Sequence, residues 1–167
     1  MPYSYSLFKT EIKQFLYQRY PKHTRILDVG PGCGTYSDLL RNRFKNMDAV
    51  EIFPKNIERF GLYAKYNKIY HGDVCDFEHF HNYTLVIMGD ILEHLSVEQA
   101  QKLLKRINCD ILVAVPYTLP QGPVGGNDHE THIQDDLTHE IVMDRYKDLK
   151  LLMNDKQYGY YFQPFKF

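Results

Sequence analysis

The sequence contains no tryptophan, only three cysteines, no excess of charge and no long hydrophobic run. The cysteines, Cys33, Cys75 and Cys109, are widely spaced and form no Cys-x-x-Cys pair, which excludes a zinc ribbon or a disulfide framework. This usage predicts a reducing cytoplasm. No run approaches the roughly 18 apolar residues of a membrane span, and the N-terminus lacks the pattern of a signal peptide. We therefore expect no membrane contact.

The charges nearly cancel, with 20 basic and 21 acidic residues and a net charge of −1. This is not the basic footprint of a nucleic-acid-binding protein, so nucleic acid is not expected as a partner. A hydrophobic fraction of 44% in 167 residues is typical of a globular chain that buries its own core. We find no internal repeat, and we predict a single domain over residues 1–167.

Hydrophobic spacing divides the chain into helices and strands. Residues 1–20 are predicted to contain an N-terminal helix, from about Tyr5 to Arg19, which Pro21 ends. Ser96 and Gln99 fit a capping box at the start of a later helix. The predicted strands are 25–30, 47–52, 68–73, 83–90 and 110–117, and the predicted helices are 36–46, a segment starting at Pro54, and 96–106.

Strands that alternate with helices indicate an α/β fold with a doubly wound, mostly parallel sheet. Residues 138–167 break this pattern. After a helix that begins near His139, segments 149–154 and 158–165 follow each other too closely for an intervening helix. They are predicted to form an antiparallel hairpin or two edge strands.

A stretch of about 20 residues, 118–137, contains several prolines and glycines and no clear periodicity. Loops of this length are uncommon in compact domains and are usually functional. Its segment Asn127-Asp128-His129-Glu130-Thr131-His132 brings three potential bases together, and Gly125 and Gly126 could act as hinges of a lid. We therefore predict a substrate loop at 118–137.

The most informative segment is the turn after the first strand, Ile-Leu-Asp-Val-Gly-Pro-Gly-Cys-Gly at 26–34. Glycines at 30, 32 and 34 let the backbone approach a ligand closely. A dinucleotide-binding enzyme would show the spacing GxGxxG, whereas this turn has GxGxG. The spacing, together with Asp28 inside the strand, argues against a nicotinamide enzyme.

The DVGPGCG string closely resembles the first motif of the class I S-adenosylmethionine (SAM)-dependent methyltransferases. The resemblance implies a Rossmann-like sheet of about seven strands with an antiparallel C-terminal strand, and a cofactor-binding core over residues 25–117. It also implies that SAM is the cofactor. The residues it assigns to SAM are Asp28, Gly30, Pro31, Gly32, Gly34, Glu51, Ile52, Asp73, Val74, Gly89 and Asp90.

In this family the acid at Glu51 accepts hydrogen bonds from the ribose hydroxyls, and Asp73 with Val74 reads the adenine edge. Ile52 is expected against the adenine ring. The glycines at 30 and 32, with Gly89 and Asp90, are expected at the methionine moiety. The family's loop after the fifth strand faces the methyl group, so Asp90, His129 and His132 are our candidate catalytic residues.

The Asp90-Ile91-Leu92-Glu93-His94 string admits two interpretations. If it is helical, Asp90, Glu93 and His94 share one face and could hold a divalent metal. A similar acid-x-x-Glu-His pattern binds a metal in some small-RNA 2′-O-methyltransferases and quinone-biosynthesis O-methyltransferases. The same string is common in family members without a metal, so we predict no metal site.

The sequence predicts methyl transfer to an oxygen or nitrogen of a small-molecule or sugar-like acceptor. It lacks the tetrapeptide of DNA adenine methyltransferases after the fourth strand and the Pro-Cys nucleophile of cytosine enzymes. The alternatives are a metal-assisted O-methyltransferase acting on an RNA end or a catechol-like hydroxyl, and a non-catalytic cofactor-binding protein. Tyrosines crowd both ends of the chain, which is compatible with a homodimer contact; they are Tyr3, Tyr5, Tyr158, Tyr160 and Tyr161.

Overall fold

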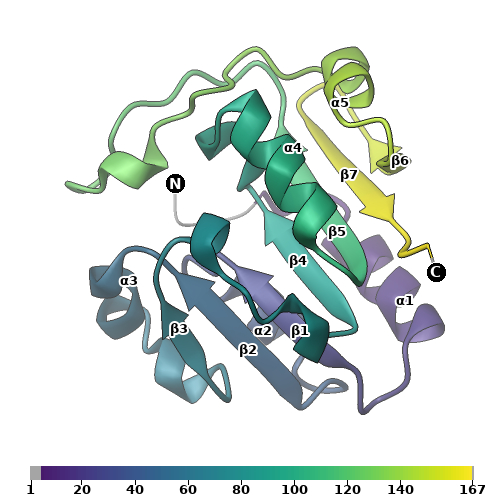
Figure 1. The fold of residues 1–167 in the computed structure, drawn as a ribbon. Coiled ribbons are helices and arrows are strands. Elements are labelled where there is room, and N and C mark those ends of the chain that lie inside the picture. The colour runs from purple at the N-terminus through teal and green to yellow at the C-terminus, as the bar shows by residue number, and fades with distance from the viewer. Residues whose placement is uncertain (1–4, 167) are drawn as a thin grey trace.

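A seven-stranded sheet with helices on both faces organises the computed structural model, which describes residues 5–166 (Figure 1). The helices are α1 (Lys9–Arg19), α2 (Thr35–Leu40), α3 (Pro54–Arg59), α4 (Val97–Arg106) and α5 (His139–Arg145). The strands are β1 (Arg25–Val29), β2 (Asn46–Glu51), β3 (Ile69–His71), β4 (Leu85–Gly89), β5 (Asp110–Pro116), β6 (Lys150–Asn154) and β7 (Tyr158–Gln163). Short 3₁₀ helices follow several strands, among them η2 (Val74–Asp76), η4 (Leu92–His94) and η5 (Asp128–Glu130).

The strand order is β3-β2-β1-β4-β5-β7-β6. Strands β1 to β5 run parallel, and β7 pairs antiparallel with both β5 and β6. The fold class predicted from the sequence is therefore confirmed, including the antiparallel hairpin at the C-terminus. Because the strand order reverses between β1 and β4, the carboxyl ends of these two strands form the switch point where such sheets bind ligands.

The sheet separates two hydrophobic layers, since successive side chains of a strand point to opposite faces. Leu27 and Val29 of β1 face the layer that contains residues of α4 and α5. Ile26 faces the layer that contains residues of α1, α2 and α3. Asp28, between these positions, is therefore directed into the α1–α2 layer, where burial of a carboxylate carries an energetic cost.

The N-terminal helix begins at Lys9 rather than at the predicted Tyr5. Tyr5 instead stacks on Tyr158 with ring centroids 5.3 Å apart, and its hydroxyl donates to Gln157 at 3.0 Å. Phe8 then turns the chain with a positive φ of 61°. Contacts with the C-terminal hairpin thus hold this segment in a non-helical conformation.

Other predicted helix boundaries agree more closely with the structure. The expected capping box is present, with Ser96 accepting from Gln99 N and Gln99 accepting from Ser96 N. Pro54 starts α3, and His139 starts α5. The predicted helix 36–46 is too long, because α2 ends at Leu40 and residues 41–43 form a turn before β2.

The interpretation of the C-terminal tyrosines as a contact surface is wrong. Tyr158, Tyr160 and Tyr161 are all at most 2% exposed and pack inside the chain. Tyr5 is 41% exposed, and Tyr3 lies outside the described residues. The hairpin tyrosines therefore belong to the core and to the site described below.

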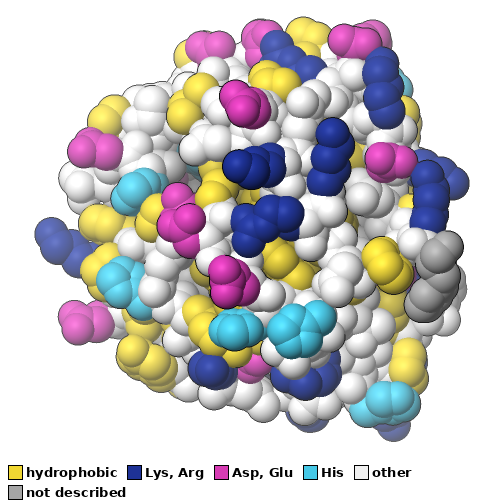
Figure 2. Space-filling view, viewed as in Figure 1, with side chains coloured by type: hydrophobic (Ala, Val, Ile, Leu, Met, Phe, Trp, Pro, Cys, Tyr) yellow, Lys and Arg dark blue, Asp and Glu magenta, His cyan; other side chains and the backbone are white. Residues whose placement is uncertain are grey.

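Within residues 5–166, none of the helices combines the length and the apolar content that crossing a membrane requires. On the face shown in Figure 2, basic and acidic side chains are interspersed. The near balance of charge in the composition is thus repeated over this face.

Candidate active site

The glycine turn at the end of β1 needs a residue without a side chain. Gly30 has a φ of 59°, and a Cβ placed on it would overlap the side chain of Ile91. Its N–H donates to Val50 O at 2.8 Å, which ties the turn to β2. The turn is therefore tied to β2, and the side chain of Ile91 packs against it where only a glycine fits.

A continuous cleft crosses the carboxyl ends of β1, β2, β3 and β4. It consists of two cavities of about 80 and 360 Å³ that share lining residues such as Gly30, Ile52 and His94. Nine of the eleven predicted cofactor residues line it: Gly30, Pro31, Gly32, Glu51, Ile52, Asp73, Val74, Gly89 and Asp90. Motifs far apart in the sequence thus meet at one edge of the sheet.

The two remaining predicted cofactor residues do not line this cleft. Asp28 is 1% exposed and accepts a hydrogen bond from the Tyr66 hydroxyl at 2.5 Å. Burial raises the pKa of Asp28 to about 7. Gly34 is the N-cap of α2 with a φ of 85°. Neither residue lines the cleft, and their assignment to the cofactor stays a prediction.

The acids at the ends of β2 and β3 are held in different ways. Glu51 is 3% exposed, and one of its oxygens accepts from Phe53 N at 2.8 Å. Burial raises its pKa despite this bond. Asp73 is half-buried and accepts from Cys75 N at 2.8 Å, as the N-cap of η2. Each carboxylate keeps acceptor capacity beyond the single bond named here.

Asp90 follows β4 in a strained conformation, with a φ of 59°. For a non-glycine residue such geometry is uncommon and clusters at functional sites. The Tyr158 hydroxyl donates to Asp90 Oδ1 at 2.5 Å. The next residues form only η4, so the helical face predicted for Asp90, Glu93 and His94 does not exist, and Asp90 is turned towards β7 instead.

Behind Asp90 lies a network that the sequence analysis missed. Lys9 Nζ donates to the hydroxyls of Tyr36 at 3.1 Å and Tyr160 at 2.8 Å. Burial lowers the pKa of Lys9 to about 8, although Asp90 and Asp28 oppose this shift. One feature of the sequence could have indicated that Lys9 is buried. It stands three residues before the buried Ile12, so this lysine lies on the apolar stripe of α1.

A third cavity, of about 430 Å³, opens on the other side of Asp90. It lies between η4, the end of β5, the start of β7 and residues of the long loop. Asp90 and His94 line both this cavity and the neighbouring cleft. A further cavity of about 420 Å³, between the end of α4 and residues 163–166, contains none of the predicted site residues.

The long loop is divided between the cleft and the third cavity. Residues 127–130, including His129, line the cleft, whereas Leu119, Gln121 and His132 line the third cavity. The two histidines therefore face different spaces. Gly125 and Gly126, with φ values of 59° and 77°, form a tight turn closed by Val124 and Asn127.

Gln134, which the sequence analysis did not select, fastens this loop to η4. Its side chain is buried, and its amide nitrogen donates to Leu92 O at 2.8 Å and Leu95 O at 2.9 Å. The Tyr146 hydroxyl donates to its oxygen at 2.8 Å. These bonds hold the loop over the cleft.

Comparisons with known proteins agree with this fold. The family model of a methyltransferase domain matches residues 27–108. No curated protein matches the sequence.

Among solved structures, a SAM-dependent methyltransferase from Clostridium acetobutylicum has 12% identity and a TM-score of 0.72, with 99% of this chain and 93% of that chain covered. The Burkholderia thailandensis 1,6-didemethyltoxoflavin-N1-methyltransferase, with its substrate and S-adenosylhomocysteine bound, has 11% identity and a TM-score of 0.66, with 96% and 79% covered. Human N-acetylserotonin methyltransferase in complex with SAM has 14% identity and a TM-score of 0.68, with 97% and 52% covered.

At these identities the structural likeness shows a shared fold. The chain spans only 55% of a similar protein from Nostoc punctiforme and 62% of PigF. It therefore corresponds to a part of these longer relatives.

Proposed function

We propose that this chain is a class I SAM-dependent methyltransferase and that it transfers a methyl group from SAM to an oxygen or nitrogen of a small-molecule or sugar-like acceptor. The cleft along β1 to β4 takes the cofactor, the 430 Å³ cavity takes the acceptor, and residues 118–137 serve as the substrate loop. We place this activity in the reducing cytoplasm, where the three cysteines, all free in the structure, remain thiols.

The fit of the cleft to SAM rests on its glycine turn and its two acids. Gly30 lines the cleft and brings no side chain of its own, so we expect the methionine moiety to pack against its backbone. Glu51 faces the cleft with an oxygen available to the ribose hydroxyls, and Asp73 with Val74 takes the adenine edge. A buried carboxylate is costly, and hydrogen bonds from ribose would offset part of that cost.

The observation that carries the proposal is the position of Asp90 and His94. Both residues line the cofactor cleft and the third cavity, so the two spaces meet beside them. The sulfonium of SAM is already activated, and the protein has mainly to hold the acceptor atom in line with the methyl group. Tyr158 fixes the carboxylate of Asp90 at this junction.

Proton removal from the acceptor is the second task of the site. We assign it to Asp90, His129 and His132, which are the basic side chains of the junction and of the loop. Of the two loop histidines, His132 lines the acceptor cavity and His129 lines the cofactor cleft. His132 is therefore the better placed to take a proton from an acceptor, and His129 to close the cleft over SAM.

The acceptor cavity has the size and surface of a small-molecule site. Pockets of roughly 300–1,000 Å³ with apolar walls and a few polar groups are typical for such ligands. Here Pro116, Tyr117 and Leu119 supply apolar surface, and Gln121 and Gln157 supply amides. This combination suits a small polar acceptor with an apolar part.

The test combines calorimetry with an activity assay. We expect stoichiometric binding of S-adenosylhomocysteine and no binding of NAD. With methyl-labelled SAM and a panel of small hydroxylated and amine acceptors, we expect transfer of label. Binding of NAD without S-adenosylhomocysteine would refute the proposal. Cofactor binding with no transfer to any acceptor class would favour the non-catalytic alternative.

A further inference from the structure

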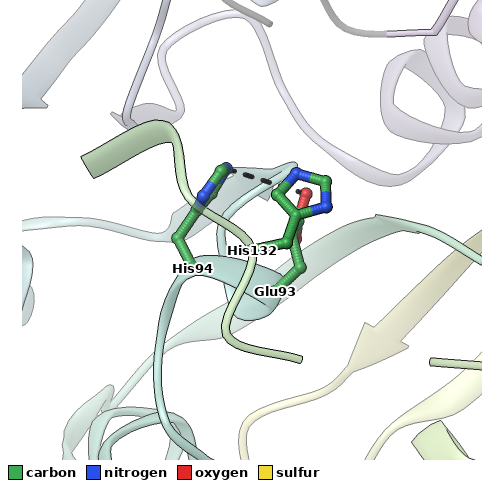
Figure 3. A group of neighbouring side chains, drawn as sticks. All are labelled: Glu93, His94 and His132. Atoms are coloured by element: carbon green, nitrogen blue, oxygen red, sulfur yellow. Dashed lines mark ion pairs between the residues drawn. The ribbon is translucent and has the colours of Figure 1, made fainter. Parts of the chain in front are cut away.

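Three side chains on the wall of the acceptor cavity converge on one point. Glu93 and His94 come from η4, and His132 comes from the long loop. One potential ligand atom from each residue lies within 4.8 Å of the others. Figure 3 shows the two imidazole rings and the carboxylate directed towards one another, with Glu93 behind His132. The cluster therefore unites residues 38 positions apart in the sequence.

The hydrogen bonds of the two histidines define which nitrogen each offers. His94 Nδ1 lies 3.1 Å from Thr131 O, and His132 Nδ1 lies 2.6 Å from Leu119 O. A carbonyl oxygen can only accept, so each Nδ1 carries the proton and donates it. The lone pair of a neutral ring is then on Nε2, which in Figure 3 faces the cluster in both residues.

This arrangement is the usual one for metal-binding histidines. Such residues donate their second ring N–H to a backbone carbonyl or a carboxylate, which fixes the tautomer and the ring orientation. The two imidazoles are thus prepared to act as ligands.

Glu93 supplies the independent observation that points to a ligand. Its side chain is 1% exposed, and neither carboxylate oxygen has a hydrogen-bond partner within the described part of the chain. His94 Nε2 lies 4.0 Å from Glu93 Oε1, which is too long for a hydrogen bond. A buried carboxylate without a partner is expensive, and a cation at this point would remove the cost.

The loop is held so that His132 stays beside this carboxylate. The backbone N–H groups of Ile133 and Gln134 donate to Glu93 O at 2.7 and 2.9 Å. His132 N also donates to Gln121 O at 2.9 Å. The geometry of the cluster is therefore set by backbone bonds on both sides.

We propose that Glu93, His94 and His132 bind one divalent transition-metal ion of the Zn²⁺ class in the wall of the acceptor cavity. Two imidazole nitrogens and one carboxylate are the ligand set of open catalytic zinc sites and of other first-row metals. The set differs from the one considered from the sequence, because Asp90 is bonded to Tyr158 and His132 takes its place.

The consequence for the substrate rests on the proposed function. Glu93, His94 and His132 all line the 430 Å³ cavity, so positions not occupied by the protein open towards the acceptor. A hydroxyl or carboxylate oxygen of the acceptor can complete the coordination shell. Such a site selects an oxygen-bearing acceptor and orients it near Asp90. When the metal holds the lone pair of His132 Nε2, Asp90 takes the proton of the acceptor.

The direct test titrates protein that has been stripped with a chelator and dialysed, with neither SAM nor acceptor present. Co²⁺ should bind with a stoichiometry of one and give visible absorption bands, and Zn²⁺ should displace it. His132→Ala, His94→Ala and Glu93→Gln should each weaken binding at least tenfold. His129→Ala, which removes a loop histidine outside the cluster, should leave the affinity unchanged.

A metal-free explanation of the cluster makes different predictions. Glu93 could remain protonated beside neutral His94, and the three residues would then serve packing alone. In that case the wild type would show no stoichiometric metal binding at 100 µM Co²⁺, or the three cluster variants would bind Co²⁺ with the affinity of the wild type. Either result overturns the proposal.

Protein stability provides the second readout. Zn²⁺ should raise the melting temperature of the wild type and of His129→Ala, and it should not raise that of Glu93→Gln. Binding of S-adenosylhomocysteine, measured on the same metal-free proteins, reports whether each variant is folded. Wild-type protein that binds S-adenosylhomocysteine but no metal would refute only the metal site, whereas wild-type protein that binds metal but transfers no methyl group would refute only the proposed function.

Discussion

The cofactor cleft and the acceptor cavity lie next to each other but are built in opposite ways. In the cleft, the two acids at the strand ends are held by near neighbours in the sequence, Glu51 by Phe53 N and Asp73 by Cys75 N. Around the acceptor cavity they join distant segments, since Asp90 meets Tyr158 and, behind it, Lys9 meets Tyr160. Motifs therefore describe the first region well and describe the second poorly.

The strongest test of the cofactor cleft is the substitution Glu51→Ala. If Glu51 accepts hydrogen bonds from both ribose hydroxyls, its removal should lower S-adenosylhomocysteine affinity about 100-fold. Two charge-assisted hydrogen bonds of about 1.5 kcal/mol each give this loss. Calorimetry measures it, and Glu58→Ala, which removes an exposed acid of α3, is the control. An affinity equal to that of the wild type would contradict the ribose assignment.

The division of the loop is tested by replacing its histidines one at a time. His132→Ala and His129→Ala should each lower turnover about tenfold or more, while cofactor affinity changes less, because a positioned base acts mainly on the chemical step. The readout is label transfer from SAM compared with calorimetric affinity. His81→Ala, an exposed histidine elsewhere, serves as the matched control. If neither loop variant alters turnover, the loop is not the wall of the active site.

The network of Lys9, Tyr36 and Tyr160 is tested by the pH dependence of protein stability. Burial lowers the pKa of Lys9 to about 8, so the folded protein releases this proton above pH 8 while the unfolded chain keeps it up to about 10.5. The cost of burying the ammonium is therefore present below pH 8 and is relieved as the pH rises. Between pH 8 and pH 9 this should add about 1 kcal/mol to the free energy of unfolding.

The measurement compares denaturant unfolding of the wild type and Lys9→Met at both pH values. Subtracting the two proteins removes the contributions of the cysteines and tyrosines that also titrate in this range. The gain with pH should be present in the wild type and absent in Lys9→Met. Equal pH dependence in the two proteins would mean that Lys9 is solvated, and the contrast between the two regions would weaken.

Local signals were sufficient for several elements. Ser96 and Gln99 cap α4 through bonds within four residues, so their pattern alone predicted the helix start. The acids at 51 and 73 follow apolar strands, and parallel strands bring their carboxyl ends to the same edge. The cleft could be predicted for this reason, because strand order and strand ends determine it.

One prediction and one open interpretation failed for a common physical reason. The helix from Tyr5 followed from periodicity, and a helical face through Asp90, Glu93 and His94 was one of two interpretations of that string. In the structure Tyr5 packs on Tyr158, and Asp90 accepts a hydrogen bond from the same tyrosine. Tertiary contacts with β7 therefore overrode local preference at both places.

By itself the sequence determined the α/β fold, the glycine turn and the edge of the sheet where a cofactor would lie, because these depend on the period of apolar residues and on strand ends. Only the tertiary structure decided that Tyr158 holds Asp90 and Tyr160 accepts from Lys9, that Asp28 is buried, and that His132 joins Glu93 and His94. The physical reason is chain distance: loop and hairpin residues acquire their partners from packing, which no local pattern records.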